Sequence, residues 1–449
     1  MAGLVCASAG CRDIAGIHDL DSWDAEAEEV EFEDASIGSR WHIVLEGDGA
    51  GSVSLSGPGL PGGLACPPTC AGSLGTAHDL TLTVLPGSGS YLASLTPDDG
   101  RPRLQPQQLR VSIIGETEIR VRFLRLRHNL VFVSSRAQPA NLGDPLAYDQ
   151  QCRALATAAG LPGDDFIALL ATAGESLRER LGAARGFVRI DGLPIANHLL
   201  DDPYWHAIIV DEMARVVPPT TYVFSSLRAW SANPGYDCTG WTSRDRGALV
   251  SLGESWAGAP TALAAISGNC SDDRPVVCAM RRFTAPMAAL SHPGKLVFVS
   301  RAALDPGAGL PAAHGLCEAE RPPRLDSSPF RALLASSGGP AARVVDVAAM
   351  YVRPDGQQIG TGAELTRGAL RTGIWQFADG DPVPANLHVM TGSQGTPESP
   401  GTPETTCRDW TARGASGGAY GTPLSTASWW GPWLTNCSDR SFHLYCVEQ

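Results

Sequence analysis

The sequence predicts an α+β protein in which two copies of one cysteine-rich domain follow a small all-β domain. Two observations predict this organisation. Four cysteines recur in the same order in two successive parts of the chain, and the flanking segments also repeat, such as Leu-Val-Phe-Val-Ser at 130–134 and 296–300. Ordered matches of this kind indicate a duplicated domain. The two sets are Cys152, Cys238, Cys270 and Cys278, and Cys317, Cys407, Cys437 and Cys446.

Composition excludes several classes of protein. The 449 residues are enough for about two to four domains, and an apolar content of 43% argues against wholesale disorder. The formal charge of −13 argues against a nucleic-acid partner and against adsorption to an anionic membrane, because both favour Lys and Arg. No apolar run reaches the roughly 18–20 residues that a transmembrane helix needs.

The cysteines indicate an oxidising compartment. Twelve cysteines in ordered positions predict disulfide bonds. Metal-binding thiols are the alternative, but zinc sites use close cysteine pairs or interleaved histidines. The only close pair is Cys66 and Cys70.

The amino-terminal segment divides into two parts. Residues 1–11 carry small residues immediately before Cys11, and this resembles a truncated bacterial lipoprotein leader with Cys11 as the lipidated residue. Residues 12–37 include a cluster of acidic side chains between Glu26 and Asp34. Like charges repel one another and stay solvated, so we expect a flexible tether.

Residues 38–127 are predicted to form a small antiparallel β domain. Apolar and polar residues alternate in short runs, most clearly at 119–126, and Gly, Pro and Asp clusters separate the runs. The order of glycine, strand, cysteine pair, strand and glycine turn resembles the divergent B-repeats of internalin-type surface proteins. By this resemblance, Cys66 and Cys70 close a tight disulfide loop.

Each repeat, 128–282 and 294–449, is expected to begin with a strand and a short helix that carries the first cysteine. An apolar segment follows, at 166–170 or 330–334, and then a strand that ends in an Asp-Gly turn. The rest is rich in Gly, Pro and Ser and is predicted to be a long loop with scattered tryptophans that ends in the cysteine-bearing strands.

These residues resemble a known fold family. The order of a first cysteine, a distant Cys-x-x-Trp, a third cysteine and a closing strand cysteine is similar to the C-type-lectin-like fold. The nearer likeness is to its endostatin-like branch, especially a bacterial domain of unknown function in secreted proteins and surface lipoproteins. Sequence alone permits three pairings in each repeat, and the resemblance implies nested ones. The implied bonds are Cys152–Cys278, Cys238–Cys270, Cys317–Cys446 and Cys407–Cys437.

The candidate ligand-binding residues lie in the second repeat. Asp379, Asp381 and Asn386 offer the hard oxygen ligands that calcium prefers, although the Glu-Pro-Asn, Gln-Pro-Asp and Trp-Asn-Asp triplets of calcium-dependent lectins do not occur. A solvated turn is the alternative for these three residues. The tryptophans at 429, 430 and 433 could stack on sugar or peptide, or fill the core of the loop.

No local pattern predicts catalysis. Residues 414–418 fit Gly-x-Ser-x-Gly, but a hydrolase elbow needs a strand before it and a helix after it. We therefore expect no catalytic or metal-binding residues and no cofactor except calcium. The sequence favours a non-catalytic bacterial lipoprotein, secreted or lipid-anchored to the envelope at the outer membrane, that binds an extracellular protein or carbohydrate. A structural envelope protein without a specific ligand is the alternative, and a hydrolase comes third.

Overall fold

A computed structural model describes residues 38–449 except 68, 76–77, 88, 97–106, 172–173, 226–234, 324–327, 415–416 and 439–440. The expected leader with Cys11 and the expected acidic tether lie outside these residues. No helix of the described part is long and apolar enough to cross a membrane.

The expectation of an α+β class is wrong, because the protein is β-rich. Strands account for 36% of the residues and helices for 13%, and the described strands form six small sheets. The helices are short, and segments expected as loop form strands instead. Residues 417–421, Gly-Gly-Ala-Tyr-Gly, make a central strand, although glycine is depleted in strands and gave no sign of one.

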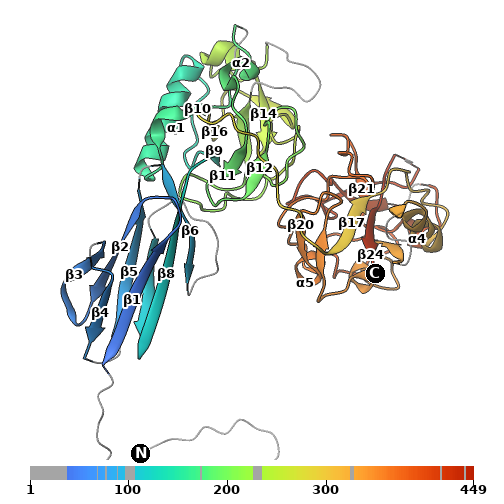
Figure 1. The fold of residues 1–449 in the computed structure, drawn as a ribbon. Coiled ribbons are helices and arrows are strands. Elements are labelled where there is room, and N and C mark those ends of the chain that lie inside the picture. The colour runs from blue at the N-terminus through green and yellow to red at the C-terminus, as the bar shows by residue number, and fades with distance from the viewer. Residues whose placement is uncertain are drawn as a thin grey trace, which may run out of the picture.

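The amino-terminal domain is a pair of four-stranded sheets (Figure 1). Along β8, arginines alternate with the buried residues Ile119, Val121 and Phe123, which face the core as the two-residue period of a strand requires. One sheet has the order β4 (Ala71–Leu74), β1 (Ser39–Glu46), β8 (Glu116–Arg125), β6 (Ser90–Thr96), and the other β3 (Leu60–Cys66), β2 (Gly51–Gly57), β5 (His78–Pro86), β7 (Gln107–Ile113).

The first repeat contains one five-stranded and one three-stranded sheet. Helix α1 (Pro145–Ala158) is capped by the preceding Asp144, whose side chain accepts a hydrogen bond from the Ala147 N–H, and it packs against β10. The first sheet has the order β10 (Phe166–Ala168), β16 (Val277–Met280), β9 (Asn129–Val133), β11 (Phe187–Arg189), β12 (Pro194–Ala196), and the second β13 (Tyr222–Ser225), β14 (Leu249–Glu254), β15 (Ile266–Asn269). The short helix α2 (Leu177–Leu181) follows β10.

The second repeat has the same topology, so the two copies share a fold as well as a sequence pattern. Helix α4 (Leu310–Ala319) takes the place of α1 and packs against β18. Its sheets have the orders β18 (Phe330–Ala332), β24 (Tyr445–Glu448), β17 (Lys295–Val299), β19 (Met350–Val352), β20 (Gln358–Thr361), and β21 (Val389–Met390), β22 (Gly417–Gly421), β23 (Trp433–Asn436). Helix α5 (Gly362–Thr366) follows β20.

The five predicted disulfide bonds are confirmed. In each repeat the outer bond joins the long helix to the last strand, with Cα atoms 5.6 Å apart for Cys152–Cys278 and 5.3 Å for Cys317–Cys446. The inner bonds, Cys238–Cys270 and Cys407–Cys437, and the bond Cys66–Cys70 are also formed.

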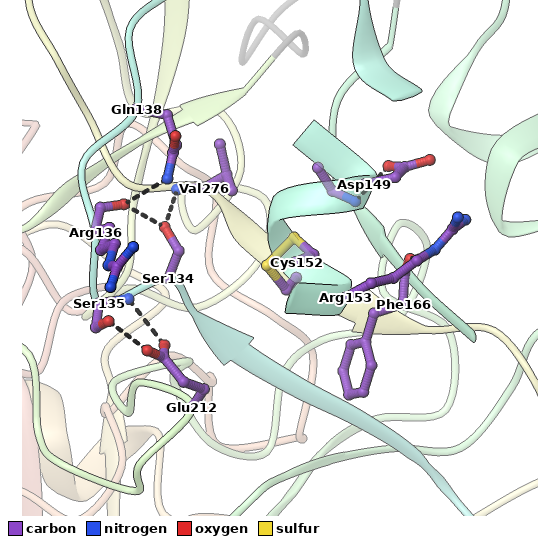
Figure 2. The surroundings of a disulfide bond; sticks show 12 residues. Ser134, Ser135, Arg136, Gln138, Asp149, Cys152, Arg153, Phe166, Glu212 and Val276 are labelled. Atoms are coloured by element: carbon purple, nitrogen blue, oxygen red, sulfur yellow. Dashed lines mark hydrogen bonds between the residues drawn. A yellow bond between two sulfur atoms is a disulfide. The ribbon is translucent and has the colours of Figure 1, made fainter. Parts of the chain in front are cut away.

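The surroundings of these bonds repeat as well. Figure 2 shows the outer bond of the first repeat, with the Val276 N–H donating to Ser134 Oγ nearby at 3.0 Å. In the second repeat the Leu444 N–H donates to Ser300 Oγ at 2.9 Å. In both repeats, therefore, the serine after the first strand accepts a hydrogen bond from the residue just before the last strand.

The Cys-x-x-Trp segments form a left-handed turn in each repeat, α3 (Cys238–Trp241) and α6 (Cys407–Trp410). All four residues of each turn have positive φ, from 50° to 66°, which non-glycine residues rarely adopt in succession. Each turn is held by its disulfide and by its tryptophan. Trp241 donates to the Ala171 carbonyl at 2.9 Å and Trp410 to the Ala335 carbonyl at 2.8 Å. Both tryptophans are therefore structural.

The two repeats meet in a buried interface. Trp375 donates its indole N–H to the Tyr204 carbonyl at 2.7 Å. The guanidinium of Arg353 is buried above the Trp375 ring, 4.8 Å from its centre, and lies 3.3 Å from the Trp205 carbonyl. Its charge is paired with Asp355 at 2.7 Å.

A second set of contacts extends this interface. Ser425 Oγ donates to the buried carboxylate of Glu254 at 2.7 Å. Main-chain hydrogen bonds join Gly258 to Leu424 at 2.7 Å and Thr426 to Trp256 at 2.9 Å. The apolar core is continuous across the boundary, so the two repeats form one unit.

Candidate functional site

A cluster of aromatic side chains lies on the small sheet β21-β22-β23 of the second repeat. The Tyr420 ring is the centre of this cluster, with ring centres of His388 at 5.2 Å, Phe442 at 5.0 Å and Trp433 at 5.6 Å. We call His388, Tyr420, Trp433 and Phe442 the aromatic patch.

The strand register explains why these rings meet. Tyr420 on β22 and Trp433 on β23 are direct cross-strand partners, so their side chains leave the sheet on the same face. The main-chain N–H of His443 donates to the His388 carbonyl at 2.9 Å, and this bond brings Phe442 beside His388. Residues far apart in the sequence therefore form one surface.

The patch is open to solvent at Trp433. Its exposed fraction is 42%, and that of the next residue, Leu434, is 53%. Strand β23 is an edge strand that pairs only with β22 in the described part of the chain. Trp433 and Leu434 leave opposite faces of the strand, and an exposed tryptophan on a sheet edge is typical of a surface that contacts a partner.

The first repeat lacks this aromatic surface at the equivalent place. There, Ile266 on β15 occupies the position of Trp433, and its cross-strand partner is Leu252 in place of Tyr420. Ile266 is similarly exposed, at 48%. The scaffold is the same, and the surface chemistry differs.

The three tryptophans proposed from the sequence have different environments. Trp429 and Trp430 are buried, with exposed fractions of 1% and 4%, and their indole N–H groups donate to the Gly368 carbonyl at 3.0 Å and to Ser393 Oγ at 3.1 Å. They fill the core, which is one of the two interpretations that the sequence offered for these tryptophans. Trp433 alone of the three lies where a ligand could reach it.

The proposed calcium ligands Asp379 and Asp381 are engaged with an arginine. Both carboxylates pair with the Arg301 guanidinium, at 2.6 and 2.9 Å, and this guanidinium lies 4.3 Å from the centre of the Phe377 ring. The hydrogen bond with Asp379 raises the pKa of Arg301, so a cation already occupies the space between the carboxylates. Asn386 is exposed on the loop that leads into β21.

The described residues contain no group of three or more His, Cys, Asp or Glu side chains that could hold a metal ion. The Gly-x-Ser-x-Gly segment falls partly outside the described residues, which omit 415–416. Its last glycine residues begin strand β22, whereas a hydrolase elbow is followed by a helix.

Sequence reasoning missed Tyr420, His388 and Phe442. Tyr420 lies in a glycine-rich run that gave no strand signal, and His388 and Phe442 come from segments 54 residues apart (442 − 388). The clue that remained was the position of Trp433, four residues before the third cysteine Cys437. No protein-family model matches this chain, and no curated protein matches it.

Proposed function

We propose that this protein is a non-catalytic recognition protein of the bacterial cell surface, and that its second repeat binds an extracellular carbohydrate or protein through the aromatic patch. The observation that carries the proposal is the exposed Trp433 ring beside Tyr420 on a sheet edge. The likeness of the cysteine framework to C-type-lectin-like domains supports it.

The disulfides bear on where the protein acts. Five bonds of this kind indicate an oxidising, extracytoplasmic environment. Beyond this, we propose a lipid anchor at Cys11 in the outer membrane, or secretion, on the basis of the residues around Cys11. Mass spectrometry of the native amino-terminal peptide tests the anchor, and an unmodified cysteine there would contradict it.

The chemistry of the patch suits both partner classes. An aromatic ring presents a negative face and a positive edge, and its flat face packs well against the C–H groups of a sugar ring. Tryptophan and tyrosine are also the residues that contribute most at the centres of protein interfaces. A polar group beside the patch is available at Thr435, which lies two residues from Trp433 on β23 and so on the same face.

The test compares the wild-type chain with Trp433→Ala and Ile266→Ala on a glycan array and a panel of surface proteins. Ile266→Ala is the matched control, because it removes an exposed side chain at the same position of the first repeat. We expect Trp433→Ala to weaken binding at least about tenfold and the control to leave it unchanged. Equal binding by both variants would refute the role of the patch.

A chelator added to the same array tests the calcium hypothesis. Because Arg301 lies between Asp379 and Asp381, we expect binding to be the same with and without chelator. Loss of binding on chelation would restore these carboxylates as calcium ligands.

A structural role without a specific ligand is the second candidate, and the buried interface between the repeats favours it. Contacts such as the Trp375–Tyr204 hydrogen bond would make the two repeats a stiff spacer. Absence of binding to every glycan and protein on the panel would support this alternative.

A further inference from the structure

A cavity of about 550 Å³ lies where the amino-terminal β domain meets the first repeat. Its volume is in the range of small-molecule sites, roughly 300–1,000 Å³. Five parts of the chain line it: the turn between β1 and β2, Tyr91 on β6, the end of β8 with the residues that follow, the Asp-Gly turn between β11 and β12, and the linker between the two repeats.

The walls of this cavity are fixed by packing and hydrogen bonds. Tyr91 and Leu126 pack against the core of the first repeat, and the Leu126 N–H donates to the Gly89 carbonyl at 2.8 Å. The linker is held by the Met287 N–H, which donates to Asn197 Oδ1 at 3.1 Å. The cavity is therefore part of the folded structure and needs no rearrangement to form.

The charge of the lining is positive in a protein that is acidic as a whole. Three arginines and one aspartate line the cavity, a formal charge of +2 (3 − 1), whereas the chain carries −13. Asp48 is already paired with Arg127, and it accepts a hydrogen bond from the Arg125 N–H at 3.0 Å. Arg122 has no ion-pair partner among the described residues and is exposed at the cavity.

The rest of the lining is mainly apolar. Leu124, Leu126, Leu130, Met287 and Leu290 contribute side chains. The phenol of Tyr91 adds a polar group, and burial raises its pKa, so that it keeps its proton and can donate a hydrogen bond. The lining thus combines a net positive charge, which attracts an anion, with apolar side chains that favour hydrocarbon.

We propose that this cavity binds a small organic anion with an apolar body, its acidic group against Arg122 and its hydrocarbon against the leucines. A charge-assisted hydrogen bond from a guanidinium is about twice as strong as a neutral one, and apolar burial adds roughly 0.8 kcal/mol for each CH₂ group. This site is separate from the aromatic patch on the second repeat, and the two proposals stand independently.

Calorimetric titration of the full chain with octanoate tests the proposal, with octanol and acetate as the neutral and the short-chain probes. We expect octanoate to bind more tightly than either. Arg122→Gln should weaken octanoate at least about tenfold and leave octanol unchanged. Arg120→Gln is the matched control, because Arg120 lies on the same face of β8 and is paired with Glu46 and Glu118 outside the cavity.

A second variant tests the location of the site. Ala289→Trp places a large side chain in the cavity from a partly exposed linker position, and we expect it to abolish octanoate binding while the circular dichroism spectrum is unchanged. Failure of octanoate to bind the wild type would overturn the proposal. So would binding that survives Ala289→Trp, or octanol binding as tight as that of octanoate.

Discussion

Replacing Arg353 with methionine should uncouple the two repeats. The guanidinium is completely buried and bonds in two directions. Within its own repeat it pairs with Asp355 and contacts the Gly373 carbonyl at 3.3 Å. Across the boundary it reaches the Tyr204 and Trp205 carbonyls at 3.4 and 3.3 Å. Methionine matches much of the hydrocarbon volume but supplies none of these hydrogen bonds.

The expected loss of stability follows from the Asp355 carboxylate, which the substitution leaves without its ion-pair partner. Removing one partner of a buried ion pair costs about 3–5 kcal/mol, because the remaining charge is desolvated and unpaired. The remaining partner, Asp355, is only 22% exposed, so water can solvate it only in part, and we expect a loss of about 3 kcal/mol. The second repeat spans residues 294–449, and a domain of this size loses roughly 2–4 °C for each kcal/mol, so its transition should fall by at least about 6 °C.

Differential scanning calorimetry with the disulfides intact measures the effect. We expect the repeats of the wild type to unfold in one transition and those of Arg353→Met to unfold in two. Arg189→Met is the matched control, because Arg189 pairs with Asp191 and contacts the Ala207 carbonyl within the first repeat alone. This control should lose stability without splitting the transition.

One result would refute this reasoning. If Arg353→Met and Arg189→Met lower the transition equally and neither splits it, the contacts to Tyr204 and Trp205 contribute nothing to coupling. The arginine would then stabilise only its own repeat.

Three further predictions concern pH and the disulfides. Burial lowers the pKa of His206 to about 4, below the unfolded value of about 6.5, so the unfolded chain binds more protons than the folded one. The free energy of unfolding should therefore fall as pH drops from about 6.5 to 4, by at most about 3 kcal/mol. Urea midpoints should show this pH dependence in the wild type and a weaker one in His206→Gln. Burial raises the pKa of Glu254, so the folded form binds more protons than the unfolded chain, and this carboxyl destabilises the interface as pH rises above about 4.5. Glu254→Gln should therefore raise the calorimetric midpoint at pH 7 and have little effect on it at pH 4. The double variant Cys407→Ser and Cys437→Ser opens a loop with a sequence separation of 30 and should lower the free energy of unfolding by about 3–4 kcal/mol. An unchanged denaturation midpoint would show that the bond does not restrain the loop.

The cysteine framework was the part of the fold that the sequence predicted best. Each disulfide requires two cysteines that are visible in the sequence, and their recurrence in the second repeat shows which cysteines are equivalent. The nested pairing required the likeness to a known fold as well, since four cysteines permit three pairings. The strands of the amino-terminal domain were also readable, because the sheets bury one face and β8 shows the resulting alternation.

The β-rich character of the repeats was not readable. Strand β22 is built from Gly417, Gly418 and Gly421 around Ala419 and Tyr420, and such a run carries no period of two. Its glycines are required by the close approach of other chain segments: a Cβ at Gly421 would lie 2.1 Å from the Trp429 carbonyl oxygen. Tertiary packing decides the conformation here, and local propensity does not.

The tryptophans show why a candidate site is harder to predict than a fold. Trp430 is buried and Trp433 is exposed, although only two residues separate them. Gly431 between them has a φ of 56°, and a Cβ there would lie 2.0 Å from the Ser393 carbonyl oxygen. The turn at this glycine leads the chain from the core to the sheet edge. Residue type alone gives no sign of such a change of direction.

The two copies of the Arg-x-Asp-Gly segment show how a duplicated domain acquires a new role without new residues. Arg189 and Arg353 each pair with the aspartate two positions later. The first bonds to a carbonyl of its own repeat, whereas the second bonds to carbonyls of the neighbouring repeat. A buried guanidinium has five N–H donors, so the donors that the ion pair leaves free can serve whichever chain segment covers them. In the second copy that segment belongs to the first repeat, and an element that stabilises one domain also joins two. Trp433 on the β23 edge is exposed in the structure that contains this interface, so joining the two repeats does not cover the aromatic patch.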